Sequence, residues 1–279
     1  MRVVLRRVHK SFAQKGQRVQ VLHDVNFSIE EGEFVCVIGP SGCGKSTLIS
    51  LIAGLEFPDT GQVFVDSKMV EGPSRDRLVV FQEAALFPWL TVLENVEFGL
   101  KIAGVGQQER RTKALDAVKL VHLSRFVNAY PHQLSGGMRQ RAAIARALVM
   151  DPKILLMDEP FAALDAQTRQ MLQEELQEIQ QKTKKTVLFV THNVREATFL
   201  SDRVFEITAR PGTIKHEYPI HIPRPRHEQD PALLTVQTRI MGSLKDEIEK
   251  VAKEQLDMDY QISKTGVVTP VERNMGSNI

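Results

Sequence analysis

The chain has 279 residues, of which 42% are hydrophobic and 25% are charged. This composition is typical of a compact globular protein and excludes collagen-like, coiled-coil and wholly disordered chains. Lysines and arginines number 36 against 34 aspartates and glutamates, a balance that argues against binding nucleic acid mainly through its phosphates. Any anion must therefore be held by a local site. The two cysteines, Cys36 and Cys43, are too few for a disulfide framework and fit a reducing compartment.

The strand signals divide into two kinds. From Val3 to Phe27, alternating apolar residues and turn residues predict an antiparallel flap. Four later runs are continuously apolar, which is the pattern of strands buried on both faces of a parallel sheet. These runs are Phe34 to Ile38, Leu78 to Phe81, Ile154 to Met157 and Val187 to Val190. No run reaches the roughly 18 uncharged apolar residues of a membrane-spanning helix, so we expect none.

The run GPSGCGKST follows the first buried strand and precedes an apolar helix, where the pattern G-x-x-x-x-G-K-[ST] has its mechanical meaning. Its glycines let backbone N–H groups turn toward phosphate oxygens at a helix N-terminus. Lys45 would add a charge at the β and γ phosphates, and the Ser46 hydroxyl would bind Mg²⁺. A plain glycine-rich turn is the alternative. The candidate ATP-binding residues are Gly39, Pro40, Ser41, Gly42, Cys43, Gly44, Lys45, Ser46 and Thr47.

The position of Cys43 suggests a further hypothesis. A cysteine inside such a cradle, at a helix N-terminus, is expected to favour the thiolate. Alkylation of Cys43 should then block ATP binding, and ATP should protect the thiol.

Helix signals replace strand signals between Gln82 and Pro131. Thr91 and Glu94 stand at capping-box spacing before an apolar helix, and Gly104 is a plausible stop. A second helix is expected to present Leu115, Val118 and Val121 on one face.

The run LSGGMRQR precedes another helix, so Ser135, Gly136 and Gly137 supply a second helix N-terminus with N–H groups and a hydroxyl. The first cradle already encloses the phosphates. An equivalent copy of the chain could therefore bring this second candidate anion site to the opposite side of the nucleotide.

The run ILLMDEP ends a buried strand in two carboxylates. Neighbouring side chains on extended backbone point to opposite sides, which allows them two different roles. We assign Asp158 to Mg²⁺ and Glu159 to the attacking water, as general base. A solvated acidic pair at a strand end is the alternative reading.

The C-terminal part begins with a proline-rich segment, HIPRPRHEQDP, which predicts the end of the core. A last helix is expected with Ser243 as its N-cap and an apolar stripe. That stripe comprises Leu244, Ile248, Val251 and Leu256. From Asp257 onward we expect an irregular tail.

Together these patterns predict the α/β fold class. The expected fold is a P-loop NTPase core with a mainly parallel sheet, an N-terminal antiparallel β flap and an inserted α-helical subdomain. The expected core comprises residues 1–82 and 151–222, the helical subdomain residues 83–150, and the C-terminal helix and tail residues 223–279.

Six motifs stand in the order found in the nucleotide-binding subunit of ATP-binding cassette (ABC) transporters, and the chain resembles that family over roughly its first 220 residues. They are GPSGCGKST, Gln82 in VVFQEAALFPW, LSGGMRQR, ILLMDEP, AALDA and His192 in VLFVTH. The resemblance implies a head-to-tail pair with two Mg-ATP at the interface, each between one chain's phosphate loop and the other's LSGG.

The resemblance also assigns roles to single residues. It gives Gln82 to Mg²⁺ and water contact, His192 to the γ phosphate and Asp165 to communication across the dimer. The alternatives are a polar strand terminus, a satisfied histidine and a helix N-cap, respectively. Phe12 occupies the place of the aromatic residue that stacks on adenine in this family, although it could simply pack in the flap.

A hydrophobic knob of Leu86, Phe87 and Trp89 follows Gln82. The resemblance implies that a permease of the membrane contacts this region, unless Phe87 and Trp89 pack in the core. Several stretches are most similar to importers of nitrate, sulfonates, taurine and related solutes such as bicarbonate. Ala162 and Asn193 differ from the residues that are usual in these importers. A periplasmic or extracellular solute-binding protein would then act indirectly, and the chain would lie on the cytoplasmic face of the membrane.

Two other functions compete with this reading. One is an ABC ATPase acting on DNA or ribosomes, but the chain lacks the long coiled coil, paired cassettes or basic stripe of such proteins. The other is an interaction module that senses nucleotide without hydrolysis, against which Glu159, Gln82 and His192 argue. We therefore expect an ATPase with no nucleic-acid partner.

Overall fold

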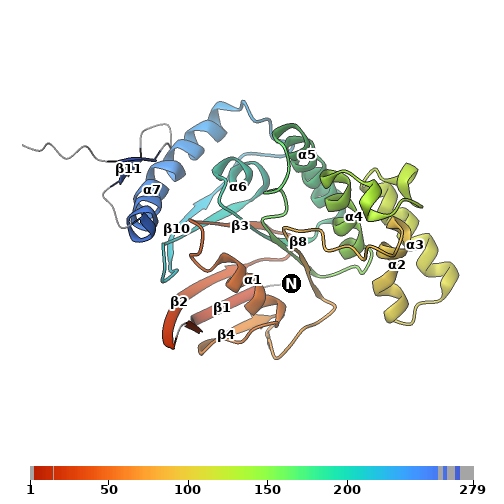
Figure 1. Ribbon diagram of the computed structural model, residues 1–279, viewed down its shortest axis with the longest axis horizontal. Helices are drawn as coiled ribbons and strands as arrows, with labels where there is room; N and C mark the ends of the chain where they lie inside the picture. Colours follow the sequence, from red (N-terminus) through yellow and green to blue (C-terminus); the bar gives the residue numbers. More distant parts are fainter. Residues whose placement is uncertain (1–2, 15, 257–259, 263–267, 271–279) are drawn as a thin grey trace, which may run out of the picture.

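The computed structural model describes residues 3–14, 16–256, 260–262 and 268–270, and a six-stranded sheet lies at its centre (Figure 1). The strand order is β10-β9-β3-β8-β7-β6. The bounds are β3 (Phe34–Ile38), β6 (Arg77–Val80), β7 (Ile154–Asp158), β8 (Thr186–Thr191), β9 (Arg203–Ile207) and β10 (Ile214–Pro219). Only the pair β9 and β10 is antiparallel. The mainly parallel α/β sheet is confirmed, and the structure adds β9 and β10 to the predicted strands.

Alternate residues of the central strands enter different cores. In β3, Phe34, Cys36 and Ile38 pack with the helices, whereas Val35 and Val37 pack on the opposite face. The same alternation holds in β7 and β8. Both faces of these strands are therefore covered, which is why the runs are continuously apolar.

A second, antiparallel sheet forms the predicted flap, in the order β2-β1-β4-β5. Its strands are β1 (Val3–Gln14), β2 (Gln17–Ile29), β4 (Thr60–Val65) and β5 (Lys68–Met69). Helix α1 (Lys45–Ala53) follows β3, and its buried residues share one core with both sheets. The flap thus holds α1 against the central sheet.

Three helices lie together at one end of the molecule, in the stretch between β6 and β7 (Figure 1). They are α2 (Val92–Ile102), α3 (Gln107–Leu120) and α4 (Gly136–Leu148), with short 3-10 helices at Ser124–Phe126 and Pro131–Gln133. The capping box of Thr91 and Glu94 is present before α2. Leu115 is 41% exposed, contrary to expectation, because α3 turns Ala114 and Val118 inward instead.

Helices α5 (Ala166–Thr183) and α6 (Val194–Leu200) follow β7 and β8, and α7 (Pro231–Leu256) is the last helix. The prediction that Ser243 caps this helix is wrong. Helix α7 begins at Pro231, beside the carboxylate of Asp230, which accepts a hydrogen bond from the Ala232 N–H at 2.8 Å. Ser243 lies inside α7, and its hydroxyl donates instead to Glu206 at 2.8 Å.

The stretch expected to be an irregular tail contains two short antiparallel strands, β11 (Tyr260–Ile262) and β12 (Val268–Pro270). Aromatic and β-branched residues favour strands, which explains the error for these residues. The rest of that stretch lies outside the described residues.

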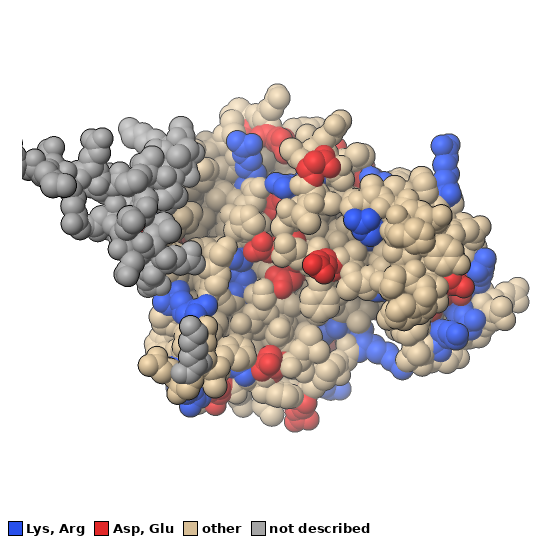
Figure 2. Space-filling model, viewed as in Figure 1, with Lys and Arg blue, Asp and Glu red and all other residues tan. Residues whose placement is uncertain are grey.

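The surface carries both signs of charge, interspersed over the face drawn in Figure 2. None of the helices in the described part of the chain combines the length and the apolar character needed to cross a bilayer.

Candidate active site

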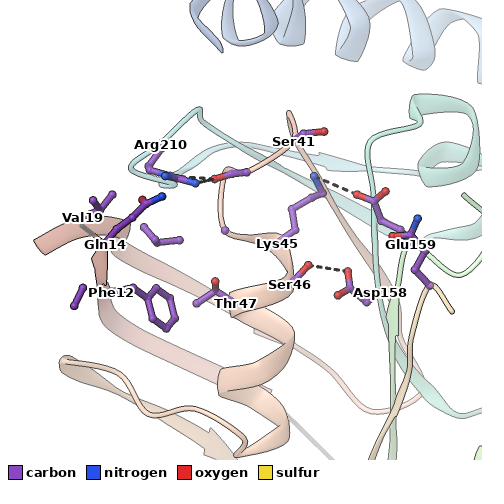
Figure 3. A pocket seen from close by; sticks show the side chains of 15 residues that line it. Phe12, Gln14, Val19, Ser41, Lys45, Ser46, Thr47, Asp158, Glu159 and Arg210 are labelled. Carbon is purple, nitrogen blue, oxygen red and sulfur yellow. Dashed lines mark hydrogen bonds and ion pairs between the residues drawn. The ribbon is translucent and has the colours of Figure 1, made fainter. Parts of the chain in front are cut away.

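Three segments that the sequence singled out meet at the carboxyl edge of the central sheet. The glycine-rich loop follows β3, Glu159 follows β7 and His192 follows β8, and these three strands are neighbours. Ligands of open α/β sheets bind at this edge. An open pocket of about 570 Å³ lies here, between the flap, the loop and the end of β7 (Figure 3). Gln82, just beyond β6, also lines it.

The loop after β3 has the backbone that its glycines allow. Gly42 and Gly44 have φ angles of 77° and 105°, in the left-handed region that favours glycine. A Cβ atom on Gly44 would lie 2.6 Å from Cδ2 of Leu22. Gly44 is the N-cap of α1 and offers no side-chain cap, so the first N–H groups of this helix face a site suited to an anion.

Lys45 is held inside this loop. Its side chain is 5% exposed, and its ammonium donates to the carbonyls of Gly39 and Pro40, at 3.0 Å each. The same ammonium lies 3.5 Å from Oε1 of Glu159. Lys45 and Glu159, the predicted base, therefore line the same pocket, although more than a hundred residues separate them in the sequence.

The carboxylates of Asp158, the last residue of β7, and of Glu159, which follows it, diverge as expected. Asp158 Oδ1 accepts a hydrogen bond from the Ser46 hydroxyl at 3.1 Å, and burial raises the pKa of Asp158. Glu159 lies beyond the strand at φ 44°, so its divergence comes from a left-handed turn rather than from the extended alternation we expected. Ser46 and Asp158 thus form an oxygen-rich corner, and Glu159 faces a different part of the pocket.

Glu159 also contacts His192, with 2.8 Å between Oε2 and Nδ1. This hydrogen bond is the main cause that lowers the pKa of Glu159, and it raises the pKa of His192. An ionised carboxylate can only accept, so we place the proton on Nδ1. At neutral pH the site therefore holds a charged carboxylate between a lysine and a histidine.

The flap supplies the other wall of the pocket. Phe12, Gln14 and Val19 line it, and the Phe12 side chain is 37% exposed, with the Lys10 ammonium 4.9 Å from its ring centroid (Figure 3). The aromatic residue that the resemblance singled out thus reaches the pocket.

Sequence reasoning missed Arg210, which lies between β9 and β10 and also lines this pocket. Its Nη2 and Nε donate to the Gly42 carbonyl at 3.0 and 3.2 Å, so it binds the back of the phosphate loop (Figure 3). No local signal could have found it, since an arginine beside a turn resembles any exposed arginine.

The expectation that Cys43 favours the thiolate is wrong. The residue is 1% exposed, its side chain belongs to the apolar core below the loop, and burial raises the pKa of its thiol. Burial outweighs the helix N-terminus here, so a thiolate is disfavoured.

Gly39 and Pro40 line a separate cavity beside α7, and His192 lines this cavity too.

Ser135, Gly136, Gly137 and Asp165 are not among the residues that line the pocket between the flap and the end of β7. Ser135 caps α4 by accepting from the Met138 N–H at 3.3 Å, and Asp165 caps α5 by accepting from the Thr168 N–H at 2.9 Å. The N-cap reading of Asp165 is thus confirmed. The two helix starts pack closely, because a Cβ atom on Gly137 would lie 2.4 Å from Cγ2 of Thr168.

The hydrophobic knob after Gln82 has two different parts. Phe87 packs on Phe98, with 4.4 Å between ring centroids, and its N–H donates to Asn95 at 2.8 Å. Trp89 is 70% exposed. Phe87 is therefore half-buried against α2, whereas Trp89 is largely exposed.

Comparisons with known proteins agree with this geometry. Residues 22–162 match the ABC transporter family. The nitrate import ATP-binding protein NrtD of Synechocystis is 50% identical over 216 residues, which cover 77% of this chain and 81% of that protein. The aliphatic sulfonates import ATP-binding protein SsuB of Bacillus cereus is 43% identical over 241 residues, 86% of this chain and 95% of that protein.

Among solved structures, the chain is similar to a dimeric ATP-binding cassette in a post-hydrolysis state bound to ADP and phosphate. The TM-score is 0.70 at 37% identity, covering 79% of this chain and all of that one. These matches agree with the phosphate loop, the acidic strand end and the histidine found at one edge of the sheet. They show that the chain belongs to the ABC transporter family and is one of its ATP-binding ATPases.

Proposed function

We propose that this chain is the ATP-hydrolysing subunit of an importer, in which the pocket at the sheet edge binds Mg-ATP and turnover drives a membrane permease. The observation that carries this proposal is the convergence of Lys45, Asp158 and Glu159 on one pocket beside His192. These are the parts that phosphoryl transfer to water requires: charge at the phosphates, a metal corner and a base.

The nucleotide would lie between the flap and α1. Its adenine would stack on Phe12, which is favourable by about 1 to 3 kcal/mol and reads no hydrogen-bonding edge. Its phosphates would bind the N–H groups from Gly42 to Thr47 and the Lys45 ammonium. Arg210 would keep this loop in place through the Gly42 carbonyl.

The Ser46 and Asp158 corner fits Mg²⁺. This ion prefers hard oxygen ligands and binds through one or two carboxylates together with substrate phosphates. A hydroxyl and a carboxylate lie 3.1 Å apart here, and Gln82 lines the same pocket. When bound, Mg²⁺ would neutralise phosphate charge.

Hydrolysis would use Glu159 as the general base. The lowered pKa keeps this carboxylate ionised at neutral pH, so it can accept a proton from the attacking water. His192 would orient Glu159 through the 2.8 Å hydrogen bond and reach toward the γ phosphate with its other ring nitrogen. A module that senses nucleotide without hydrolysis has no use for this pair.

A second copy, or a related ABC ATPase, would complete the site. Ser135, Gly136, Gly137 and Asp165 are absent from the lining of their own chain's pocket. We infer that they act across a head-to-tail dimer, on the nucleotide of the partner. The dimeric assembly of the similar ADP-bound cassette supports this arrangement.

The permease would contact the knob of Leu86, Phe87 and Trp89, whose exposed member is Trp89. The similarity to NrtD and SsuB supports a small anionic cargo such as nitrate or a sulfonate, with taurine and bicarbonate as further candidates. Cargo would be recognised by the permease and a solute-binding protein outside the membrane, and this chain would sit on the cytoplasmic face of the membrane.

The test is reconstitution of the chain with the permease encoded beside it in vesicles. We expect ATP hydrolysis to rise when one of these anions and its binding protein are added, and Trp89→Ala to abolish that stimulation while leaving basal hydrolysis unchanged. Tight copurification with DNA or ribosomes, and no stimulation by any of the anions, would contradict an importer.

A further inference from the structure

A buried carboxylate outside the pocket has no role in the function described so far. Glu196, on α6, is 4% exposed and is hydrogen-bonded through both carboxylate oxygens. A buried carboxylate loses hydration, and its burial raises the pKa of Glu196. Such a group is costly to keep, so its partners indicate what it does.

One oxygen of Glu196 is hydrogen-bonded to the segment that carries His192. Its Oε2 accepts from the Thr191 hydroxyl at 2.6 Å, and the same hydroxyl accepts from the Asn193 N–H at 3.0 Å. Asn193 in turn caps α6 by accepting from the Arg195 N–H at 2.9 Å. The residues on both sides of His192 are therefore tied to Glu196, and this fixes the backbone from which the imidazole reaches Glu159.

The other oxygen faces the helix that Asp165 begins. Oε1 of Glu196 accepts from Gln173 at 3.2 Å and lies 3.7 Å from Nε of Arg169. Arg169 also donates through Nη2 to the Leu164 carbonyl at 2.8 Å. Nε of Arg169 is buried without a hydrogen bond, so the ion pair with Glu196 is what compensates its burial.

We propose that Glu196 is a positioning residue that joins the loop before Asp165 to His192. The inference rests on the proposed roles of His192 and Asp165. A displacement of Leu164 would pass through Arg169 to Glu196, and from there through Thr191 to the backbone of His192. The residue predicted to report the partner subunit would thus be linked, within one chain, to the residue that orients the base.

The first experiment compares Glu196→Gln with the control Glu206→Gln. Glu206 is equally buried, on β9, and accepts from Tyr218 at 2.8 Å and from Ser243. We expect Glu196→Gln to lower kcat for ATP by about 10-fold to 100-fold, with KM changed by less than about 2-fold. Thr191→Val, which removes the bridging hydroxyl, should reproduce this split, and Glu206→Gln should not.

Melting temperatures of all variants separate positioning from folding. If Glu196→Gln and Glu206→Gln lower Tm equally but only the first lowers kcat, the proposal stands. If both lower kcat in proportion to Tm, or if Glu196→Gln leaves kcat unchanged, it is overturned.

The second experiment is a double-mutant cycle with His192→Ala, measured in single-turnover hydrolysis. If Glu196 acts through His192, Glu196→Gln should cost nothing further in the His192→Ala background, whereas additive losses would overturn the inference. A fully active His192→Ala variant would instead refute the proposed role of His192 itself. The two failures are therefore distinguishable.

Discussion

The two glycine-rich turns of this chain, Gly39–Thr47 and Leu134–Arg141, look alike in sequence and differ in structure. In the first, Gly42 and Gly44 adopt left-handed φ angles, and the acids of β7 lie against the loop. In the second, Gly136 and Gly137 belong to α4, and the Ser135 hydroxyl caps its own helix. One turn is surrounded by the charged groups of its own chain, and the other presents a helix end.

This contrast is consistent with the proposal that both turns contact one nucleotide from different chains. The first turn lies beside Lys45, the oxygen-rich corner of Ser46 and Asp158, and Glu159 of its own chain, so under the proposed function it would support both binding and chemistry. The second turn packs against the start of α5, and its Gln140 side chain donates to the Phe81 carbonyl at 3.2 Å. If the second turn acts across a dimer, as proposed, it would contribute only when another molecule brings the anion to it, and we expect its effect on turnover rather than on binding.

The largest expected effect is that of Glu159→Gln, which removes the base beside the first turn. We expect hydrolysis to fall by about two to four orders of magnitude, while ATP binding persists and an ATP-bound dimer accumulates. Steady-state hydrolysis, nucleotide binding and sedimentation of the ATP-bound protein measure the three effects. Wild-type turnover in this variant would refute the assignment.

Phe12→Ala should weaken nucleotide binding at the first turn by about 5-fold to 150-fold, which corresponds to about 1 to 3 kcal/mol of stacking. Phe12→Tyr, which keeps an aromatic face, is the matched control and should bind normally. Fluorescent-nucleotide titration is the measurement. Equal affinities for Phe12→Ala and wild type would show that Phe12 serves the flap alone.

The contrast in backbone predicts opposite responses to an added methyl group. Gly44→Ala puts a Cβ atom at φ 105° and 2.6 Å from Leu22, so we expect strain of about 1 to 3 kcal/mol and a large loss of nucleotide affinity. Gly136→Ala would put its Cβ atom 3.3 Å from Cδ2 of Leu164 and 4.0 Å from Nη2 of Arg139, in a helical backbone. It should leave the affinity of a single chain unchanged. Similar losses of affinity in the two variants would break the comparison.

Ser135→Ala tests the second turn. Loss of the N-cap should destabilise the chain by about 0.5 to 2 kcal/mol, and hydrolysis should fall, without a change in the ATP affinity of the monomer. Denaturant unfolding and equilibrium binding at low protein concentration provide the two measurements. Weaker binding to the monomer would place Ser135 in its own chain's site.

The smallest effect concerns the Glu159 and His192 contact beside the first turn. The lowered pKa of Glu159 adds stability above roughly pH 4.3 that is lost as pH falls through that lowered pKa. The raised pKa of His192 adds stability below roughly pH 6.5 that is lost as pH rises through that raised pKa.

Both contributions are therefore complete together only between roughly pH 4.3 and 6.5. The difference in Tm between wild type and His192→Ala should be largest in that window and shrink at higher pH. Because the imidazole is 56% exposed, we expect a small difference. A Tm difference that is constant across pH would contradict the charged pair.

Much of the fold and part of the site could be predicted because their signals are local. A buried strand followed by GPSGCGKST indicates a phosphate cradle, and the apolar runs indicate strands with both faces covered. The capping box of Thr91 and Glu94 likewise predicts the start of α2, because its signal is local. Predictions failed where two environments compete: Cys43 is at a helix N-terminus but in the core, and Ser243 looks like a cap but bonds to β9.

The amino-acid sequence therefore contains the groups that the chemistry needs: the glycines that permit the loop, and the lysine, acids and histidine that follow the strands. Which of these groups meet depends on how the strands pack. The parallel order of β3, β8 and β7 brings Lys45, Glu159 and His192 together. The fold also places Arg210 and Glu196 where the spacing of residues in the sequence does not predict them. The reason is physical, since spacing encodes local backbone geometry, whereas burial and ion pairing depend on neighbours distant in the chain.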